Sequence, residues 1–127
     1  MRTALHQTAG TPGDPDANLT ALARTAGDAA ASGAQLLVLP EMWLSGYNLG
    51  DRVWALAEAA DGPSAAAVAG IARRFGLAIL YGFPERDADR VFNAAQLIDA
   101  HGTRRACYRK AHLFAETETR LFAPGDA

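Results

Sequence analysis

The chain has 127 residues, half of them apolar, so we expect one domain whose hydrophobic core buries about two-thirds of the unfolded chain's surface. Its 12 Lys and Arg and 14 Asp and Glu give a formal net charge of -2, spread along the chain without the basic stripe that nucleic-acid binding requires. The single cysteine excludes an internal disulfide and no cluster of Cys or His indicates a metal site, so we expect no metal, no cofactor and no nucleic-acid partner.

The first predicted element is a short strand at residues 2–7, where polar residues interrupt any signal-like apolar segment. The strongest apolar run of the chain, residues 77–83, is too short to span a bilayer. From these two segments we predict a soluble, cytoplasmic protein without a membrane partner.

A helix is predicted over residues 15–32. Asp14 is a suitable N-cap residue, Pro15 fits the first helical position, and Asp16 complements the positive end of the helix dipole. Apolar residues then recur at intervals of three and four, the spacing of one helical face, and Gly33 suits the end of the helix. These apolar residues are Leu19, Leu22, Ala23, Ala26, Ala29 and Ala30. Because most of them are alanines, this face should pack closely on a sheet.

Residues 35–39 predict a buried strand that carries Glu41 at its carboxyl end. The segment is apolar on both faces, as expected for a strand that is covered on both sides. Pro40 has no backbone N–H and therefore ends the strand pairing. Since loops at strand ends commonly carry functional side chains, Glu41 is a candidate site residue.

The rest of the chain predicts two helices followed by three strands. The expected helices cover residues 51–60 and 63–75, and Gly76 ends the second one. The expected strands cover residues 77–82, 91–99 and 103–110, with turns at 84–89 and 100–102. Strands that alternate with helices, followed by three successive strands, predict a mixed α/β fold.

Lys110 ends the last predicted strand, and the alternation of side chains places it on the face opposite Cys107. Three residues of strand also separate the two by roughly 10 Å along the backbone. We therefore expect Cys107 to be an ordinary, buried packing residue rather than a nucleophile that works beside Lys110.

Two motifs lie at the ends of predicted strands. The first is Leu39-Pro40-Glu41-Met42-Trp43-Leu44-Ser45-Gly46-Tyr47, and the second is Tyr108-Arg109-Lys110-Ala111-His112-Leu113-Phe114. Asn93 stands between them in a strand, and Pro124-Gly125-Asp126 follows them. In this order the motifs resemble the amino-terminal half of an amidase of the nitrilase superfamily of carbon-nitrogen hydrolases, and the resemblance covers essentially the whole chain.

The resemblance implies a fold and a set of site residues. The superfamily fold is an α-β-β-α sandwich, two sheets between layers of helices, and this chain would form half of it around a mixed sheet. At the matching positions Glu41 would be the general base and Lys110 the cation beside the developing oxyanion. Glu118 would be a second glutamate that positions the substrate and holds the lysine. Glu116 lies two residues away, so the choice between Glu116 and Glu118 stays open at this point.

The resemblance also implies that residues 1–127 are a carbon-nitrogen hydrolase domain truncated before the catalytic cysteine motif, which would follow a few tens of residues beyond Lys110. The expected function is hydrolysis of a small non-peptide amide or nitrile by a Cys-Glu-Lys mechanism, with this chain inactive alone. The family further implies a homo-oligomer, and the chain would need the missing carboxyl-terminal half. Two alternatives stay open: a non-catalytic module that binds amides, and an inactive fragment of such an enzyme. The residues do not choose among amide, nitrile and carbamoyl substrates.

Five further polar or aromatic residues could belong to a site. His6 and His112 are expected to be packed or hydrogen-bonded rather than acid-base groups. Trp43 and Tyr47 either line the substrate entrance beside Glu41 or fill the core. Asn93 is expected to form hydrogen bonds within its strand rather than to contact a substrate.

Overall fold

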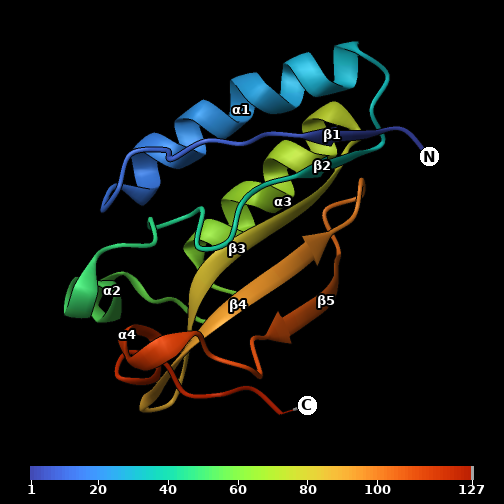
Figure 1. Ribbon diagram of the computed structural model, residues 1–127. Helices are drawn as coiled ribbons and strands as arrows, with labels where there is room; N and C mark the ends of the chain where they lie inside the picture. The colour runs from blue at the N-terminus through green and yellow to red at the C-terminus, as the bar shows by residue number, and fades with distance from the viewer. Residues whose placement is uncertain (127) are drawn as a thin grey trace.

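The computed structural model of the protein describes residues 1–126, and its centre is a five-stranded sheet. The strands follow the order β1-β2-β3-β4-β5 across the sheet (Figure 1). Their bounds are Thr3–Leu5 (β1), Leu36–Val38 (β2), Ala78–Asp87 (β3), Arg90–Ile98 (β4) and Arg104–Arg109 (β5). Strands β1 to β3 are parallel, whereas β3 to β5 are antiparallel. The predicted mixed α/β fold is confirmed, although β1 and β2 are shorter than expected.

Two helices, α1 (Pro15–Ala31) and α3 (Pro63–Phe75), lie side by side and pack on one face of this sheet (Figure 1). Both begin and end as the local sequence predicts. A side-chain oxygen of Asp14 accepts a hydrogen bond from the backbone N–H of Ala17 at 3.0 Å, and Gly76 ends α3 with a φ of 60°. Within residues 1–126, no helix is long and apolar enough to cross a membrane.

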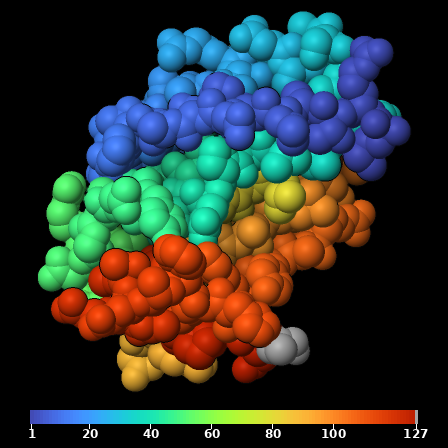
Figure 2. Space-filling model, in the orientation of Figure 1, coloured from blue at the N-terminus to red at the C-terminus, as the bar shows by residue number. Residues whose placement is uncertain are grey.

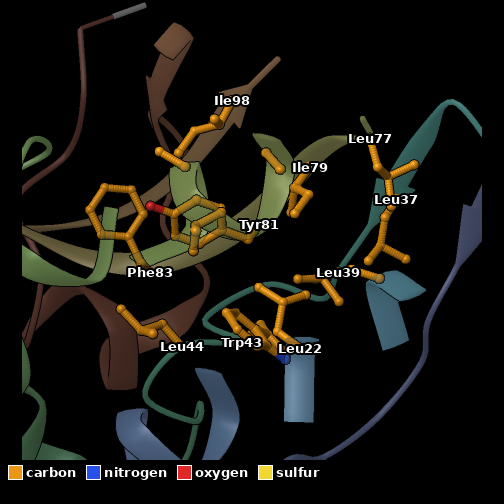
Figure 3. Packing of buried hydrophobic residues seen from close by; sticks show 14 of the residues in the cluster. Leu22, Leu37, Leu39, Trp43, Leu44, Leu77, Ile79, Tyr81, Phe83 and Ile98 are labelled. Carbon is orange, nitrogen blue, oxygen red and sulfur yellow. The ribbon is translucent and has the colours of Figure 1, made fainter. Parts of the chain in front are cut away.

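The hydrophobic core lies between these helices and the sheet (Figure 3). Ile79, Tyr81 and Phe83 alternate along β3, belong to this core and are each at most 2 % exposed. Leu22 of α1 belongs to the same cluster. The ring of Trp43 meets that of Tyr81 edge-on, with 6.1 Å between the ring centroids. Trp43 therefore fills the core.

The opposite face of the sheet is also apolar. The strand register aligns Leu5, Val38, Leu80 and Leu97 in one row across four strands. Leu5 is 75 % exposed and the other three are half-buried, whereas Leu37, Ile79 and Ile98, which are paired with one another on the core side, are each at most 2 % exposed. Because side chains alternate along a strand, one face of the sheet packs on helices and the other stays open in the described part of the chain.

The helix predicted at residues 51–60 is wrong in its second half. A 3₁₀ turn, η1 (Gly50–Arg52), and one helical turn, α2 (Val53–Leu56), are followed by extended backbone. Glu58 instead pairs with β3, where its N–H donates to the Pro84 carbonyl at 3.1 Å and its carbonyl accepts from the Arg86 N–H at 2.7 Å. Pairing with β3, which is distant in sequence, overrides the local helical preference.

The turn predicted at residues 84–89 is also too long. Strand β3 continues through Pro84 to Asp87, and only Ala88 and Asp89 form the turn to β4. Pro84 lacks a donor but keeps a carbonyl, which accepts the hydrogen bond from Glu58. The proline therefore costs the sheet one donor without ending the strand.

Candidate active site

Glu41 lies in a tight turn that follows β2. The residue after it, Met42, is fully buried and has a φ of 53°, a left-handed conformation that non-glycine residues rarely adopt. The N–H of Trp43 donates to the Pro40 carbonyl at 3.2 Å, and the N–H of Leu44 donates to the Gly82 carbonyl at 3.0 Å. Such strained positions persist only where the surroundings hold them, and they are frequent at functional sites.

Gly82 of β3 lets this turn lie directly on the sheet. A Cβ atom at this position would come within 2.7 Å of the Pro40 carbonyl oxygen and would also collide with the backbone N of Met42. Neither contact can be relieved by rotating a side chain, because both partners are backbone atoms. The absence of a side chain at Gly82 is therefore part of what places Glu41.

The carboxylate of Glu41 meets Lys110 and Asn93. The Lys110 ammonium lies 2.8 Å from Oε1 of Glu41, although 69 residues separate the two in the chain. The side-chain amide of Asn93 donates to the same oxygen at 2.7 Å. Lys110 follows the last residue of β5, and its backbone N–H donates to the Asn93 carbonyl at 2.8 Å. The structure therefore brings the two candidates predicted from separate motifs into direct contact.

Glu118 lies on the other side of the same ammonium. It belongs to the short helix α4 (Ala115–Thr119), is 2 % exposed, and its Oε1 is 3.0 Å from Nζ of Lys110. Oε1 also accepts a hydrogen bond from the Tyr47 hydroxyl at 2.7 Å, and Oε2 accepts one from the Phe114 N–H at 2.6 Å. Glu116 is exposed on the same helix. Glu118 is thus the glutamate that faces the lysine; its role in catalysis stays a prediction.

Hydrogen bonds control the charges of this cluster. The bond to Glu41 raises the pKa of Lys110, burial opposes this, and the bond to Glu118 adds to the rise. Burial alone would raise the pKa of Glu118, but the hydrogen bonds from Phe114, Tyr47 and Lys110 outweigh it and hold that pKa below its ordinary value. The same bond to Glu118, with burial, raises the pKa of Tyr47. At neutral pH the site therefore holds an ammonium cation and an ionised Glu118.

The charge of Lys110 can be tested directly because it is the single lysine of the sequence. We expect Glu41→Gln and Glu118→Gln each to lower the pKa of Lys110, with the larger drop for Glu41→Gln, since that bond is the main cause of the rise. Isotope-labelled lysine gives one side-chain NMR signal, whose pH titration reports this pKa. Glu116→Gln removes an exposed carboxylate from the same helix and should leave the titration unchanged. Equal Lys110 pKa values in all four proteins would contradict the contacts described above.

The same shift predicts how pH affects stability. The pKa of Lys110 in the folded protein lies above its ordinary value of 10.5. Its contribution to the free energy of unfolding is therefore fully present below that ordinary value, and it is lost as pH rises through the folded-state pKa.

Cys107 lies on the face of β5 opposite Lys110, as predicted. Its Sγ is 3.8 Å from a carboxylate oxygen of Glu85. Partial desolvation of the thiol and the charge of Glu85 raise the pKa of Cys107 to about 11, so the thiol stays protonated at neutral pH. The expectation that Cys107 is buried is wrong: the residue is exposed, because β5 is an edge strand.

The sequence did not predict the contacts that two residues make in the site, although it left open that Tyr47 lines the substrate entrance. Asn93 does form the expected strand hydrogen bonds through its backbone, but its side chain also binds Glu41. Tyr47 is 40 % exposed and holds Glu118, so it belongs to the site rather than to the core. The pairs Asn93–Glu41 and Tyr47–Glu118 span 52 and 71 residues of sequence. The signal in the sequence was that Tyr47 lies in the first motif and that Asn93 lies between the two motifs.

Two cavities adjoin the cluster. One, of 490 Å³, opens on the uncovered face of the sheet and is lined by Glu41, Asn93, Lys110 and His112 among others. The other, of 590 Å³, lies beside Glu118 between α4 and the segment 47–54. Figure 2 shows these two segments, red and green, packed against each other. The indole N–H of Trp54 joins them by donating to the Leu121 carbonyl at 2.9 Å.

No group of three or more His, Cys, Asp and Glu side chains in residues 1–126 is placed to hold a metal ion. The charged groups of the cluster are two carboxylates and one ammonium, which meet where the strands of an α/β sheet end. Such an arrangement provides a proton acceptor and a positive charge next to an open cavity. A proton acceptor beside a fixed positive charge is an arrangement that acid-base chemistry can use.

Comparison with known proteins identifies the family. The carbon-nitrogen hydrolase family model matches residues 2–127, and the chain belongs to this family. A hydrolase of Pseudomonas protegens, described by its position in the pqqF 5′ region, is 52 % identical over 99 % of this chain and 44 % of that protein. An (R)-stereoselective amidase of Pseudomonas sp. is 35 % identical over 99 % of this chain and 45 % of that protein.

The structures agree with the sequence comparison. The crystal structure of an amidase from Nesterenkonia sp. superposes with a TM-score of 0.89 at 33 % identity, covering all of this chain and 49 % of the amidase. Variants of that amidase are in complex with acrylamide and with butyramide. Another variant carries the acetamide moiety of fluoroacetamide on its active site cysteine. The chain thus spans about half the length of these relatives, and the predicted half of a nitrilase-superfamily fold is confirmed.

Proposed function

We propose that this chain supplies the base and the cation of a carbon-nitrogen hydrolase that cleaves small non-peptide amides or nitriles. The observation that carries the proposal is the convergence of Glu41 and Glu118 on the ammonium of Lys110. The cysteine nucleophile would come from a segment outside residues 1–127. We also propose that this enzyme is cytoplasmic and, following the family resemblance, a homo-oligomer.

The geometry suits a thioester mechanism for an amide substrate. Glu41 takes the proton of the cysteine thiol, and the thiolate attacks the carbonyl carbon. The Lys110 ammonium stabilises the negative charge that develops on the carbonyl oxygen, a contribution of about 3 kcal/mol for one well-placed donor. The protonated Glu41 then returns its proton to the leaving nitrogen, and the C–N bond breaks to leave a thioester. Finally Glu41 takes a proton from water, which attacks the thioester. The C–S bond breaks to release the acid, and the protonated Glu41 returns its proton to the leaving thiolate.

Glu118 has a different role in this proposal. Three donors occupy its two oxygens and hold its pKa below the ordinary value, so it does not accept a proton readily. It holds the ammonium of Lys110 in place and keeps it charged. Glu41 is the more accessible carboxylate, since its side chain is 47 % exposed against 3 % for Glu118. This difference supports Glu41 as the proton acceptor.

Cys107 is not the nucleophile in this mechanism. Its side chain lies on the face of β5 opposite Lys110, and its thiol pKa of about 11 keeps it unreactive at neutral pH. We therefore expect the chain by itself to hydrolyse neither amides nor nitriles. The amide complexes of the Nesterenkonia amidase favour short aliphatic amides as substrates.

The proposal is tested by completing the site. Residues 1–127 are joined to the part of the Pseudomonas protegens hydrolase that this chain does not match; we call this fusion the joined protein. Acetamide, propionamide, butyramide and the matching nitriles are then assayed for ammonia release. We expect turnover of at least one of these compounds by the joined protein and none by the 127-residue chain. A folded joined protein that releases no ammonia would refute hydrolysis, and binding heat without turnover would instead favour the amide-binding module.

A further inference from the structure

Asn93 connects the two functional groups of the site. It lies in the middle of β4, is 4 % exposed, and binds Glu41 through its side chain and Lys110 through its backbone carbonyl. The two bonds, of 2.7 and 2.8 Å, hold segments that are 69 residues apart in the sequence. A residue fixed by the sheet on both sides is well suited to set the distance between base and cation.

Within residues 1–126, only one of the two carboxylate oxygens of Glu41 accepts hydrogen bonds. Oε1 accepts from both Asn93 and Lys110, whereas Oε2 accepts no hydrogen bond from any residue in the range 1–126. A carboxylate oxygen offers two lone-pair positions, so the two donors occupy those of Oε1. Oε2 keeps both of its positions free in a side chain that is 47 % exposed.

We propose that Asn93 is a positioning residue that directs proton transfer to Oε2 of Glu41. This inference rests on the proposed function, because it concerns the oxygen that takes the thiol proton. Lys110 alone could not fix the plane of the carboxylate, since its flexible side chain can follow the carboxylate as it rotates. The amide of Asn93 is neutral, so it orients the carboxylate without adding a second positive charge that would weaken the base.

Loss of this donor should affect the chemical step more than binding. In Asn93→Leu only Lys110 still binds the carboxylate, so its plane can tilt away and neither oxygen is held at the place where the thiol proton is transferred. We expect kcat of the joined protein to fall about 100-fold, the effect of misplacing a catalytic group by about 1 Å, and KM to change by less than about threefold. Asn93→Asp keeps the shape but replaces the donor by a negative charge, so its loss of kcat should be larger.

Gln96 provides a matched control on the same strand. It is also a buried amide, fully shielded from solvent, but it binds the hydroxyl of Tyr81 on the core side of the sheet. Gln96→Leu should lower the melting temperature while keeping kcat within about threefold of the unmodified joined protein. An Asn93→Leu protein with unchanged kcat, or one whose loss of kcat is matched by Gln96→Leu, would overturn the proposal.

A second measurement does not depend on activity. The chain contains five glutamates, so 13C-labelled side-chain carboxyl groups give few NMR signals, and Glu41→Gln identifies that of Glu41. Asn93→Leu should shift the Glu41 signal at neutral pH, and Gln96→Leu should not. If the joined protein is inactive, the proposed function fails, and this shift still decides whether Asn93 orients Glu41. An unchanged Glu41 signal in Asn93→Leu would overturn the positioning role whatever the activity.

Discussion

Replacing Glu41 by Gln in the joined protein should lower kcat for amide hydrolysis about 10²- to 10⁴-fold, the usual contribution of a general base. The substitution keeps the size of the side chain and one carbonyl oxygen for Lys110, but it removes the group that takes the thiol proton. Steady-state ammonia release measures the effect, with KM determined separately to show that the loss lies in kcat.

Glu116→Gln is the control for this experiment. It removes the same charge by the same chemical change, at an exposed position on α4 that has no contact with Lys110. We expect its kcat to stay within about twofold of the unmodified joined protein, as for most exposed surface substitutions. Comparable activity in Glu41→Gln and in the control would show that Glu41 is not the base.

Local signals in the sequence were enough for the elements whose ends depend on neighbouring residues. Helix α1 begins where Asp14 and Pro15 predict, and α3 ends at Gly76. The helix predicted over 51–60 failed because Glu58 pairs with β3, a contact that no short window of sequence contains. The same pairing explains why strand β3 continues through Pro84, because the carbonyl of this proline accepts a hydrogen bond from the N–H of Glu58.

The residues of the site also fall into those that the sequence predicted and those that needed the structure. Glu41 and Lys110 were predicted because each stands in a recognisable motif at a strand end. The choice between Glu116 and Glu118 needed the course of α4, which begins at Ala115 with a φ of 54° and turns Glu118 toward the lysine. The contact of Asn93 with Glu41 depends on the exact register of β4, which periodicity does not determine.

Arg109, next to Lys110 in sequence, anchors β5 from the other face of the sheet. Its guanidinium donates two hydrogen bonds to the carboxylate of Glu85, at 2.7 and 2.8 Å, and a third to Asp87 at 3.0 Å. It also lies 4.1 Å from the centroid of the Phe92 ring. Glu85 is 4 % exposed, so this is an ion pair with one fully buried partner.

Arg109→Leu should therefore destabilise the joined protein strongly. The substitution leaves Glu85 buried without its cation, which costs about 3 kcal/mol, the lower end for broken buried pairs because the arginine side chain is 31 % exposed. Chemical denaturation measures the loss in the free energy of unfolding. Adding Glu85→Gln to Arg109→Leu should recover part of the loss, since the double variant no longer buries an unpaired charge.

Arg105→Leu is the matched control for this prediction, because it makes the same change four positions earlier on β5. Arg105 pairs with Asp99 at 2.6 Å, but its side chain is 62 % exposed, and an exposed ion pair contributes little to stability. We therefore expect Arg105→Leu to leave the free energy of unfolding nearly unchanged. If the two leucine variants were equally stable, the buried carboxylate of Glu85 would not depend on Arg109, and the anchoring of the strand that carries Lys110 would have to come from its backbone bonds to β4 alone.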